Sequence, residues 1–175
     1  MIMHPKIHIS NIKCSFKVDH KWEETISKLK SHLNIKYYPN FVVIRIEDFC
    51  FTLFKAPILG GYSHLNITKI RSFEHLLYAA QKISEFIDGT ILYDTLKVDN
   101  ITASSHLHSS IDIRRFVESQ SGVFNISLNQ DRFPGCFIRS PLGTAILFHT
   151  GRLIIVGSKS TRDIKCVVRE IQSAL

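Results

Sequence analysis

An internal duplication constrains the fold of this chain more than any other feature of its sequence. Residues 132–159 read as three short strands joined by tight turns, and their residues have strong β-propensity. A weaker copy of this stretch lies upstream. Arg45 and Arg139 are 94 residues apart, and Phe54 and Phe148 have the same separation.

A second pair of segments extends the duplication toward the amino terminus. KIHISNIKCS, which starts at Lys6, matches TLKVDNITAS, which starts at Thr95, and the match sets Asn11 and Asn100 89 residues apart. Two unrelated segments that share a strand-like composition are the alternative, but several collinear matches at a nearly constant offset argue against it. We therefore expect two copies of one unit, residues 1–88 and 89–175.

Hydrophobic periodicity predicts the same order of elements in both copies: a strand, a helix, several antiparallel strands and a long helix. Asp19 is the expected cap of the first helix, and Phe73 and Leu77 are expected in the core. Residues 56–62 are expected to form a turn insertion. The helices are predicted over 20–33, 72–87, 111–119 and 162–174, and the strands over 6–18, 42–46, 50–55, 65–68, 91–104, 123–128, 136–139, 145–149 and 153–156.

This pattern predicts an α+β fold. Two such units can join their sheets edge to edge about a pseudo-twofold axis, which hides one edge of each sheet. The helices would cover one face of the continuous antiparallel sheet, and its twist would make the other face concave. A bare apolar sheet face needs a partner.

Composition restricts the function classes. The net charge is +7 and is shared by both halves, which suits a polyanionic partner, although a solvated basic surface explains it as well. Four scattered cysteines without a C-x-x-C pair indicate reduced thiols rather than a disulfide scaffold or a zinc site. We expect an intracellular protein with no cofactor, no metal and no membrane span.

The paired segments SNIKCS and DNITAS, together with FPGCFIRS and ILFHTGRLIIVGSK, resemble the motifs of the TATA-box-binding protein family. The resemblance covers nearly the whole chain and is most specific in the second half. It implies a saddle-shaped fold whose concave sheet binds and bends DNA through the minor groove.

The family's site residues map onto positions of this chain. The resemblance implies that Asn11 and Asn100 donate hydrogen bonds to bases and that aromatic side chains insert between base steps. Plain core phenylalanines, strand-end asparagines and surface arginines are the alternatives. The implied inserting residues are Phe133, Phe148, Phe54 and either Phe41 or Tyr38, the implied phosphate contacts are Arg45, Arg139, Lys69 and Lys159, and Val156 is a further DNA-contact candidate.

The implied function is that of a non-enzymatic transcription initiation factor. Its partners would be A·T-rich double-stranded promoter DNA, a B-type initiation factor and an RNA polymerase assembly. It would act in the nucleus or at a viral transcription site. No catalytic arrangement is visible in the sequence.

Some residues depart from the family pattern. Lys13 and Thr102 replace valines, and the loop 129–132 holds little of the acid that receives the B-type factor in the family. These changes suggest a viral or divergent eukaryotic lineage. The alternative function is a protein-interaction subunit of a transcription complex with weak or no DNA binding of its own.

Overall fold

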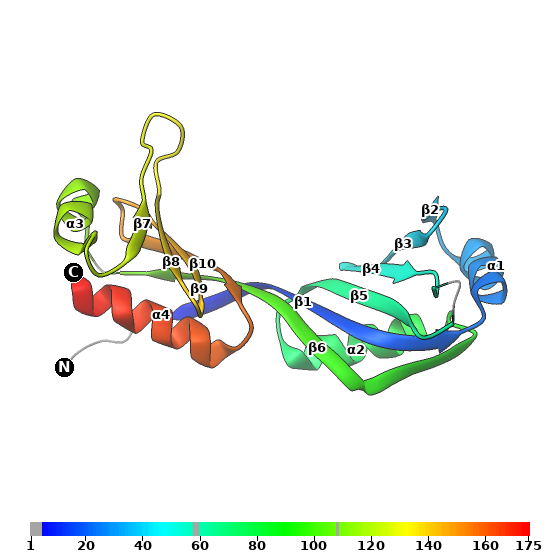
Figure 1. The fold of residues 1–175 in the computed structure, drawn as a ribbon. Coiled ribbons are helices and arrows are strands. Elements are labelled where there is room, and N and C mark those ends of the chain that lie inside the picture. Colours follow the sequence, from blue (N-terminus) through cyan, green and yellow to red (C-terminus); the bar gives the residue numbers. More distant parts are fainter. Residues whose placement is uncertain (1–4, 58–59, 108) are drawn as a thin grey trace. The chain divides into compact units, whose positions relative to one another are not determined.

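A computed structural model describes residues 5–57, 60–107 and 109–175 of the chain. Within these residues it is an α+β structure with four helices and ten strands, as the sequence predicted (Figure 1). The helices are α1 (Trp22–His32), α2 (Phe73–Ser84), α3 (Ile113–Gln120) and α4 (Thr161–Ala174). The strands are β1 (Ile7–His20), β2 (Ile35–Tyr38), β3 (Phe41–Ile46), β4 (Phe49–Phe54), β5 (Ser63–Ile70), β6 (Gly89–His106), β7 (Asn125–Ser127), β8 (Cys136–Ser140), β9 (Gly143–Leu147) and β10 (Arg152–Ser158).

The strands are hydrogen-bonded in the order β2-β3-β4-β5-β1-β6-β10-β9-β8-β7. The pairings from β2 to β5 and onto β1 are antiparallel, and so are those from β6 through β10 to β7. Consecutive strands therefore form meanders, and short turns join β2 to β3, β3 to β4, β8 to β9 and β9 to β10, which explains the turn residues there. None of the helices in the described part is long and apolar enough to cross a membrane.

The contacts group the chain into two compact units. The first unit is Asn11–Asp99, and the second is Asn100–Leu175 together with the chain up to Ser10. The two long strands β1 and β6 each contribute one part to either unit. This division follows packing, whereas the duplication in the sequence follows the order of elements along the chain.

The core of the first unit lies between its strands and α2. Side chains alternate between the two faces of β3 and β4, and those that face the helix are fully buried. Helix α2 packs against β5, and the Ser72 side chain accepts a hydrogen bond from the His75 N–H at its start. This core contains Val42, Ile44, Phe51, Leu53, Leu65, Ile67, Leu76, Ala80 and Ile83.

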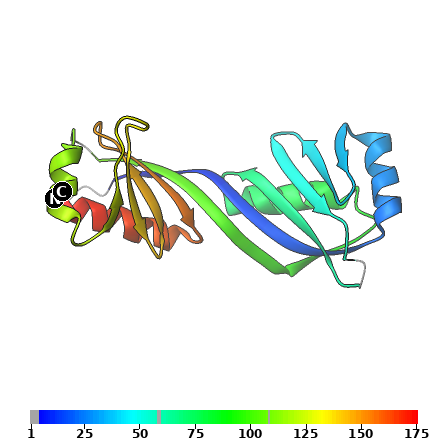
Figure 2. The same ribbon diagram turned by 45° about the horizontal axis from the view of Figure 1, so that its top comes forward.

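The second unit repeats this arrangement around α4, which packs against β9 and β10 (Figure 2). Ser160 caps α4 by accepting a hydrogen bond from the Asp163 N–H, as Ser72 does for α2. The buried residues are Ala145, Leu147, Leu153, Ile155, Ile164, Val167, Val168 and Ile171.

Three expectations about the first unit need correction. Asp19 does not cap α1, because β1 continues to His20 and the cap position falls on Lys21 without a side-chain bond. Phe73 and Leu77 are 45% and 60% exposed, since α2 turns Leu76, Ala79, Ala80 and Ile83 toward the sheet. Strand β2 was not predicted. Part of the expected 56–62 insertion, residues 58–59, lies outside the described residues.

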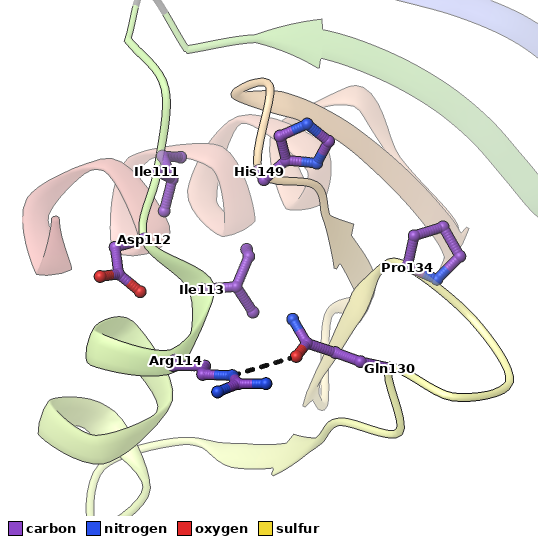
Figure 3. Close-up of a pocket in the computed structure, with 7 residues that line it drawn as sticks. All are labelled: Ile111, Asp112, Ile113, Arg114, Gln130, Pro134 and His149. Carbon is purple, nitrogen blue, oxygen red and sulfur yellow. Dashed lines mark hydrogen bonds between the residues drawn. The ribbon is translucent and has the colours of Figure 1, made fainter.

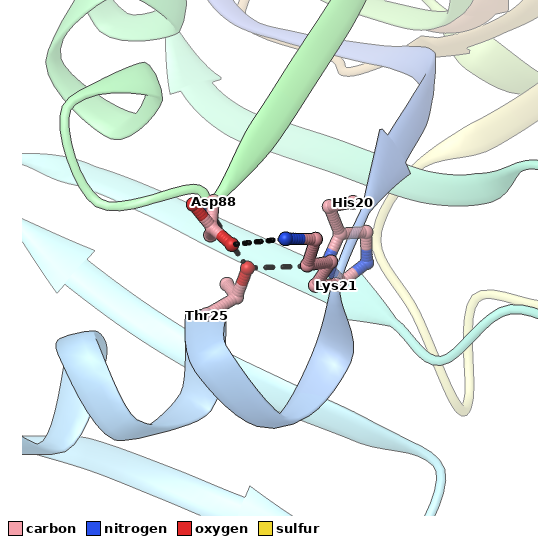
Figure 4. A network of polar contacts seen from close by, with 4 residues as sticks. All are labelled: His20, Lys21, Thr25 and Asp88. Carbon is pink, nitrogen blue, oxygen red and sulfur yellow. Dashed lines mark hydrogen bonds and ion pairs between the residues drawn. The ribbon is translucent and has the colours of Figure 1, made fainter.

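A polar network joins the start of α1 to Asp88, the residue directly before β6 (Figure 4). The fully buried Thr25 accepts a hydrogen bond from the Asp88 N–H at 3.0 Å, and its Oγ1 lies 3.2 Å from His20 Nδ1. His20 Nε2 lies 3.0 Å from the Ser63 hydroxyl. Burial lowers the pKa of His20 from 6.5, against smaller opposing effects of backbone hydrogen bonds at Lys21 and Phe54 and of the Asp19 charge.

The lowered pKa of His20 predicts a loss of stability on acidification. Below about pH 6.5 the unfolded chain binds a proton at this position that the folded first unit resists, so the free energy of unfolding decreases as the pH falls through that range. The free energy of unfolding can be measured by urea unfolding at several pH values from about 5 to about 7.5. The fluorescence of the single tryptophan, Trp22, reports on the transition, and its ring lies 5.8 Å from the His20 ring.

His20→Gln should flatten the pH dependence of the unfolding midpoint between these limits. His64→Gln, which removes an exposed imidazole from the same unit, is the matched control and should leave the slope unchanged. A slope that is the same in the wild type and in His20→Gln would contradict the assignment.

Candidate nucleic-acid interface

Each unit has one sheet face that its long helix does not cover. In the first unit, the cross-strand partners Val43, Thr52, Asn66 and Ser15 form a row on this face, on neighbouring strands β3, β4, β5 and β1. All four side chains are half-buried, between the fully buried residues that face the helix. We call these four residues the first row.

The second unit has the corresponding row. Phe137, Ile146, Ile154 and Ser104 are cross-strand partners on β8, β9, β10 and β6, and we call them the second row. Member by member, the second row follows the first by 94, 94, 88 and 89 residues. The same hydrogen-bonding register therefore recurs at the offsets of the sequence duplication, and the two repeats are pseudo-symmetric.

Three aromatic rings gather at one end of the open face of the first unit. Tyr38 stacks on Phe41 with ring centroids 4.4 Å apart, and Phe41 lies 5.7 Å from Phe54, its partner across β3 and β4. None of the three belongs to the buried core under α2. We call these three residues the first aromatic cluster. It contains both Phe41 and Tyr38, the two alternatives for the fourth inserting residue.

The second unit has a corresponding aromatic cluster. Phe133 lies 5.8 Å from Phe148 and 5.3 Å from Phe137 between ring centroids, and it is 37% exposed. Gly135 makes room for this second aromatic cluster. A Cβ atom at that position would lie 2.6 Å from Phe133 Cε1 and 2.7 Å from Ile146 Cγ2.

The loop that carries Phe133 runs from β7 to β8 and projects beyond both strands (yellow in Figure 1). The Phe133 N–H donates to the Asn129 carbonyl at 3.0 Å, and Arg114 Nε of α3 donates to Gln130 Oε1 at 3.2 Å. A cavity of about 380 Å³ lies between α3 and this loop, with Pro134 at its edge (Figure 3). One side-chain hydrogen bond thus joins α3 to this loop.

Asn11 and Asn100 hold the same position in the two units. The Oδ1 atom of Asn11 accepts a hydrogen bond from the Lys69 N–H at 2.8 Å, and the Oδ1 atom of Asn100 accepts one from the Gly157 N–H at 2.7 Å. Both backbone donors lie where the strand register shifts, and both residues have positive φ, 66° at Lys69 and 84° at Gly157.

These bonds fix the orientation of both amide groups, because a backbone N–H can donate only to the oxygen of the amide. The Nδ2 group is thereby left as a donor. In Asn100 it makes one long contact of 3.4 Å with Thr102 Oγ1. Asn11 in the first unit and Asn100 in the second therefore each present Nδ2 as a hydrogen-bond donor of fixed orientation on the open face of their unit.

The four basic candidates are exposed. Arg45 and Arg139 are exposed on β3 and β8, opposite Cys50 and Thr144, and the Arg139 guanidinium lies 6.0 Å from the centre of the Phe137 ring. Lys69 and Lys159 are exposed, and Val156 is half-buried.

The asparagine contacts relate Lys69 to Gly157, so the counterpart of Lys159 is Arg71, which is also exposed. Sequence reasoning missed Arg71, Asn66 and Phe137. The offset of 88 residues between β5 and β10 would have identified Arg71 from Lys159, whereas Asn66 and Phe137 are found only from the cross-strand register. Lys13 and Thr102, which replace valines of the family pattern, are both half-buried.

Two of the four cysteines, Cys14 and Cys136, are buried in the core. Burial raises the pKa of Cys14 to about 11, with a smaller contribution from the Asp99 charge, and burial also raises the pKa of Cys136. Both thiols are therefore protonated core groups. Among residues 5–57, 60–107 and 109–175, no three His, Cys, Asp or Glu side chains are placed to hold a metal ion.

Comparison with known proteins agrees with this geometry. Residues 95–175 match the family described as "Transcription factor TFIID (or TATA-binding protein, TBP)". A TATA-box-binding protein of Pyrodictium occultum is 33% identical over 79 residues, which are 44% of this chain and 38% of that protein. One of Methanothermobacter thermautotrophicus is 33% identical over 76 residues, 42% of this chain and 40% of that protein. These two matches thus span about two fifths of the relatives' length.

Longer matches cover both units. TATA-box-binding protein 1 of Methanosarcina acetivorans is 23% identical over 176 residues, 97% of this chain and 94% of that protein. The solved structure of Methanococcus jannaschii TBP has the same fold, with a TM-score of 0.77 and 22% identity over 97% of this chain and 98% of that one. These longer matches show that the chain has the fold of the TATA-box-binding proteins, and the family match places the likeness in sequence within residues 95–175.

Proposed function

We propose that this chain is a transcription initiation factor that binds and bends promoter DNA through the minor groove. The observation that carries the proposal is the repeated set on the open faces: an aromatic cluster at one end and an asparagine with a fixed donor. Each unit would hold one half of the DNA site. A B-type initiation factor and an RNA polymerase assembly would then join the bent complex.

The asparagines suit the chemistry of the minor groove. At A·T pairs the groove presents only the acceptors adenine N3 and thymine O2. A donor is needed there, and the Oδ1 bonds of Asn11 and Asn100 to the backbone leave Nδ2 in that role. Because A·T and T·A look alike in this groove, the contact selects A·T pairs without fixing their order.

The aromatic clusters suit DNA deformation. Apolar side chains that enter a base step from the minor groove unstack it at a cost of a few kcal/mol, which the extra contacts of the bent duplex offset. In both clusters one ring is braced by another, Phe41 by Phe54 on the next strand and Phe133 by Phe148, which directly follows β9. Such bracing would keep a ring in place as it separates stacked bases.

The basic residues would position the duplex. Arg45, Arg139, Arg71 and Lys159 are exposed in matching pairs, and the chain carries +7. Contacts to phosphates give affinity and register but not sequence preference. The alternative, a subunit that binds proteins through these faces, is favoured by the polar Lys13 and Thr102. Binding that weakens steeply between about 50 and 200 mM salt would favour DNA.

Removing a ring from either aromatic cluster should abolish bending. In a fluorescence energy transfer assay on an A·T-rich duplex labelled at both ends, Phe133→Ala, Phe148→Ala and Phe54→Ala should lose most of the change in transfer, and affinity should fall about tenfold or more. Phe73→Ala, the same change on the exposed side of α2, is the matched control. Bending that survives all three cluster variants would contradict the proposal.

Asn11→Asp separates the two tasks of the asparagine. The carboxylate still accepts from the Lys69 N–H, so the fold should persist, but the donor is lost and affinity for the A·T-rich duplex should fall about tenfold or more. Asn34→Asp makes the same charge change at an exposed site between α1 and β2 and should have a much smaller effect. Titration of a fluorescent duplex measures the affinities of both variants. Equal losses of affinity in the two variants would contradict the role assigned to Asn11.

Gly135→Ala tests the placement of the Phe133 ring. The added methyl group would meet Phe133 and Ile146 side chains, so the ring must move, and bending should decrease although Phe133 is retained. Gly122→Ala adds a methyl group with nothing within 4 Å and serves as the control. The same assay, together with thermal unfolding, measures the outcome; full bending by Gly135→Ala would show that ring placement is unimportant.

A further inference from the structure

The two open faces have different chemistry at equivalent places. The centre of the first row is Thr52 and Asn66, whereas the centre of the second row is Ile146 and Ile154. The next residues on the same face of β5 and β10 are Thr68 in the first unit and Val156 in the second. The first unit thus presents hydroxyl and amide groups where the second presents branched hydrocarbon.

Asn66 is the polar residue at the centre of the first row. It is half-buried between its cross-strand neighbours Thr52 and Ser15. Its side-chain amide makes no hydrogen bond to any other residue in the described part of the chain, unlike the side-chain amides of Asn11 and Asn100. A half-buried amide without a protein partner retains an acceptor and two donors for a ligand that lies on this face.

The minor groove contains a group that distinguishes these two surfaces. A G·C pair differs from an A·T pair there by the guanine N2 amino group, a donor that projects into the groove. Against the isoleucines of the second row that donor would be buried without an acceptor, which is costly. Against the first row, Asn66 Oδ1 can accept from it.

We propose that the first row accepts G·C pairs in its half of the DNA site, whereas the second row requires A·T pairs. This inference rests on the proposed function and assigns Asn66 and Ile154 as the residues that set the difference. Its consequence is directional. A duplex with G·C pairs in one half only would bind in the orientation that sets this half against the first row.

Guanine and inosine provide the test, because inosine lacks only the N2 amino group. Four duplexes carry I·C or G·C pairs at equivalent steps of an otherwise A·T-rich site: inosine in both halves, guanine in the left half, guanine in the right half, and guanine in both. Wild-type protein should bind either half-guanine duplex within about threefold of the inosine duplex, and the double-guanine duplex about tenfold or more weakly.

Two variants change the expected pattern in opposite directions. Asn66→Val should make both half-guanine duplexes bind about tenfold or more weakly, because neither half then accepts the amino group. Ile154→Asn should restore binding of the double-guanine duplex to within about threefold of the inosine duplex. Asn34→Val, at an exposed site away from the row, should behave as the wild type.

The outcomes separate this inference from the function on which it rests. Tight binding of the inosine duplex with a full loss for each half-guanine duplex would overturn the inference and leave the proposed function in place. An unchanged pattern in both Asn66→Val and Ile154→Asn would also overturn it. Absence of binding to the inosine and A·T duplexes would overturn both.

Discussion

One-sided burial of the sheet is the constraint on which the rest of the structure depends. Because successive side chains of a strand point to opposite faces, packing one face under α2 or α4 decides which residues are left on the other face. Val42, Ile44 and Leu53 are fully buried, so Val43 and Thr52 between them must lie on the open face. A shift of one residue in any strand would exchange the two sets.

The repeated register gives the open faces their organisation. Since each strand keeps its own offset, the aromatic clusters, rows and tied asparagines occur at equivalent places in both units although few of their residues are identical. A duplicated frame can therefore keep its geometry while the chemistry of each half changes separately. The polar first row and the apolar second row are examples of such a change.

Most of the fold could be predicted from the sequence, because it depends on local patterns and on the duplication. All four helices and nine of the ten strands of the described part correspond to predicted elements. Strand β2 was missed because Ile35–Tyr38 has no clear alternation of polar and apolar residues. The exposure of Phe73 and Leu77 was missed because helical spacing allows two adjacent apolar stripes, and only the direction in which the helix packs chooses between them. The cross-strand rows depend on registers and bulges, which no short stretch of sequence specifies.

Lys69 has a left-handed backbone conformation that favours glycine, the residue found at its counterpart Gly157. The Asn11 side chain tethers this strained position, so the same amide both stabilises the strand and offers its Nδ2 to a ligand. A residue with two such tasks can hardly be exchanged without loss of one of them. Under the proposed function, a change of DNA preference would therefore proceed through side chains such as Asn66, which makes no side-chain hydrogen bond within the described residues, while the two asparagines stay fixed.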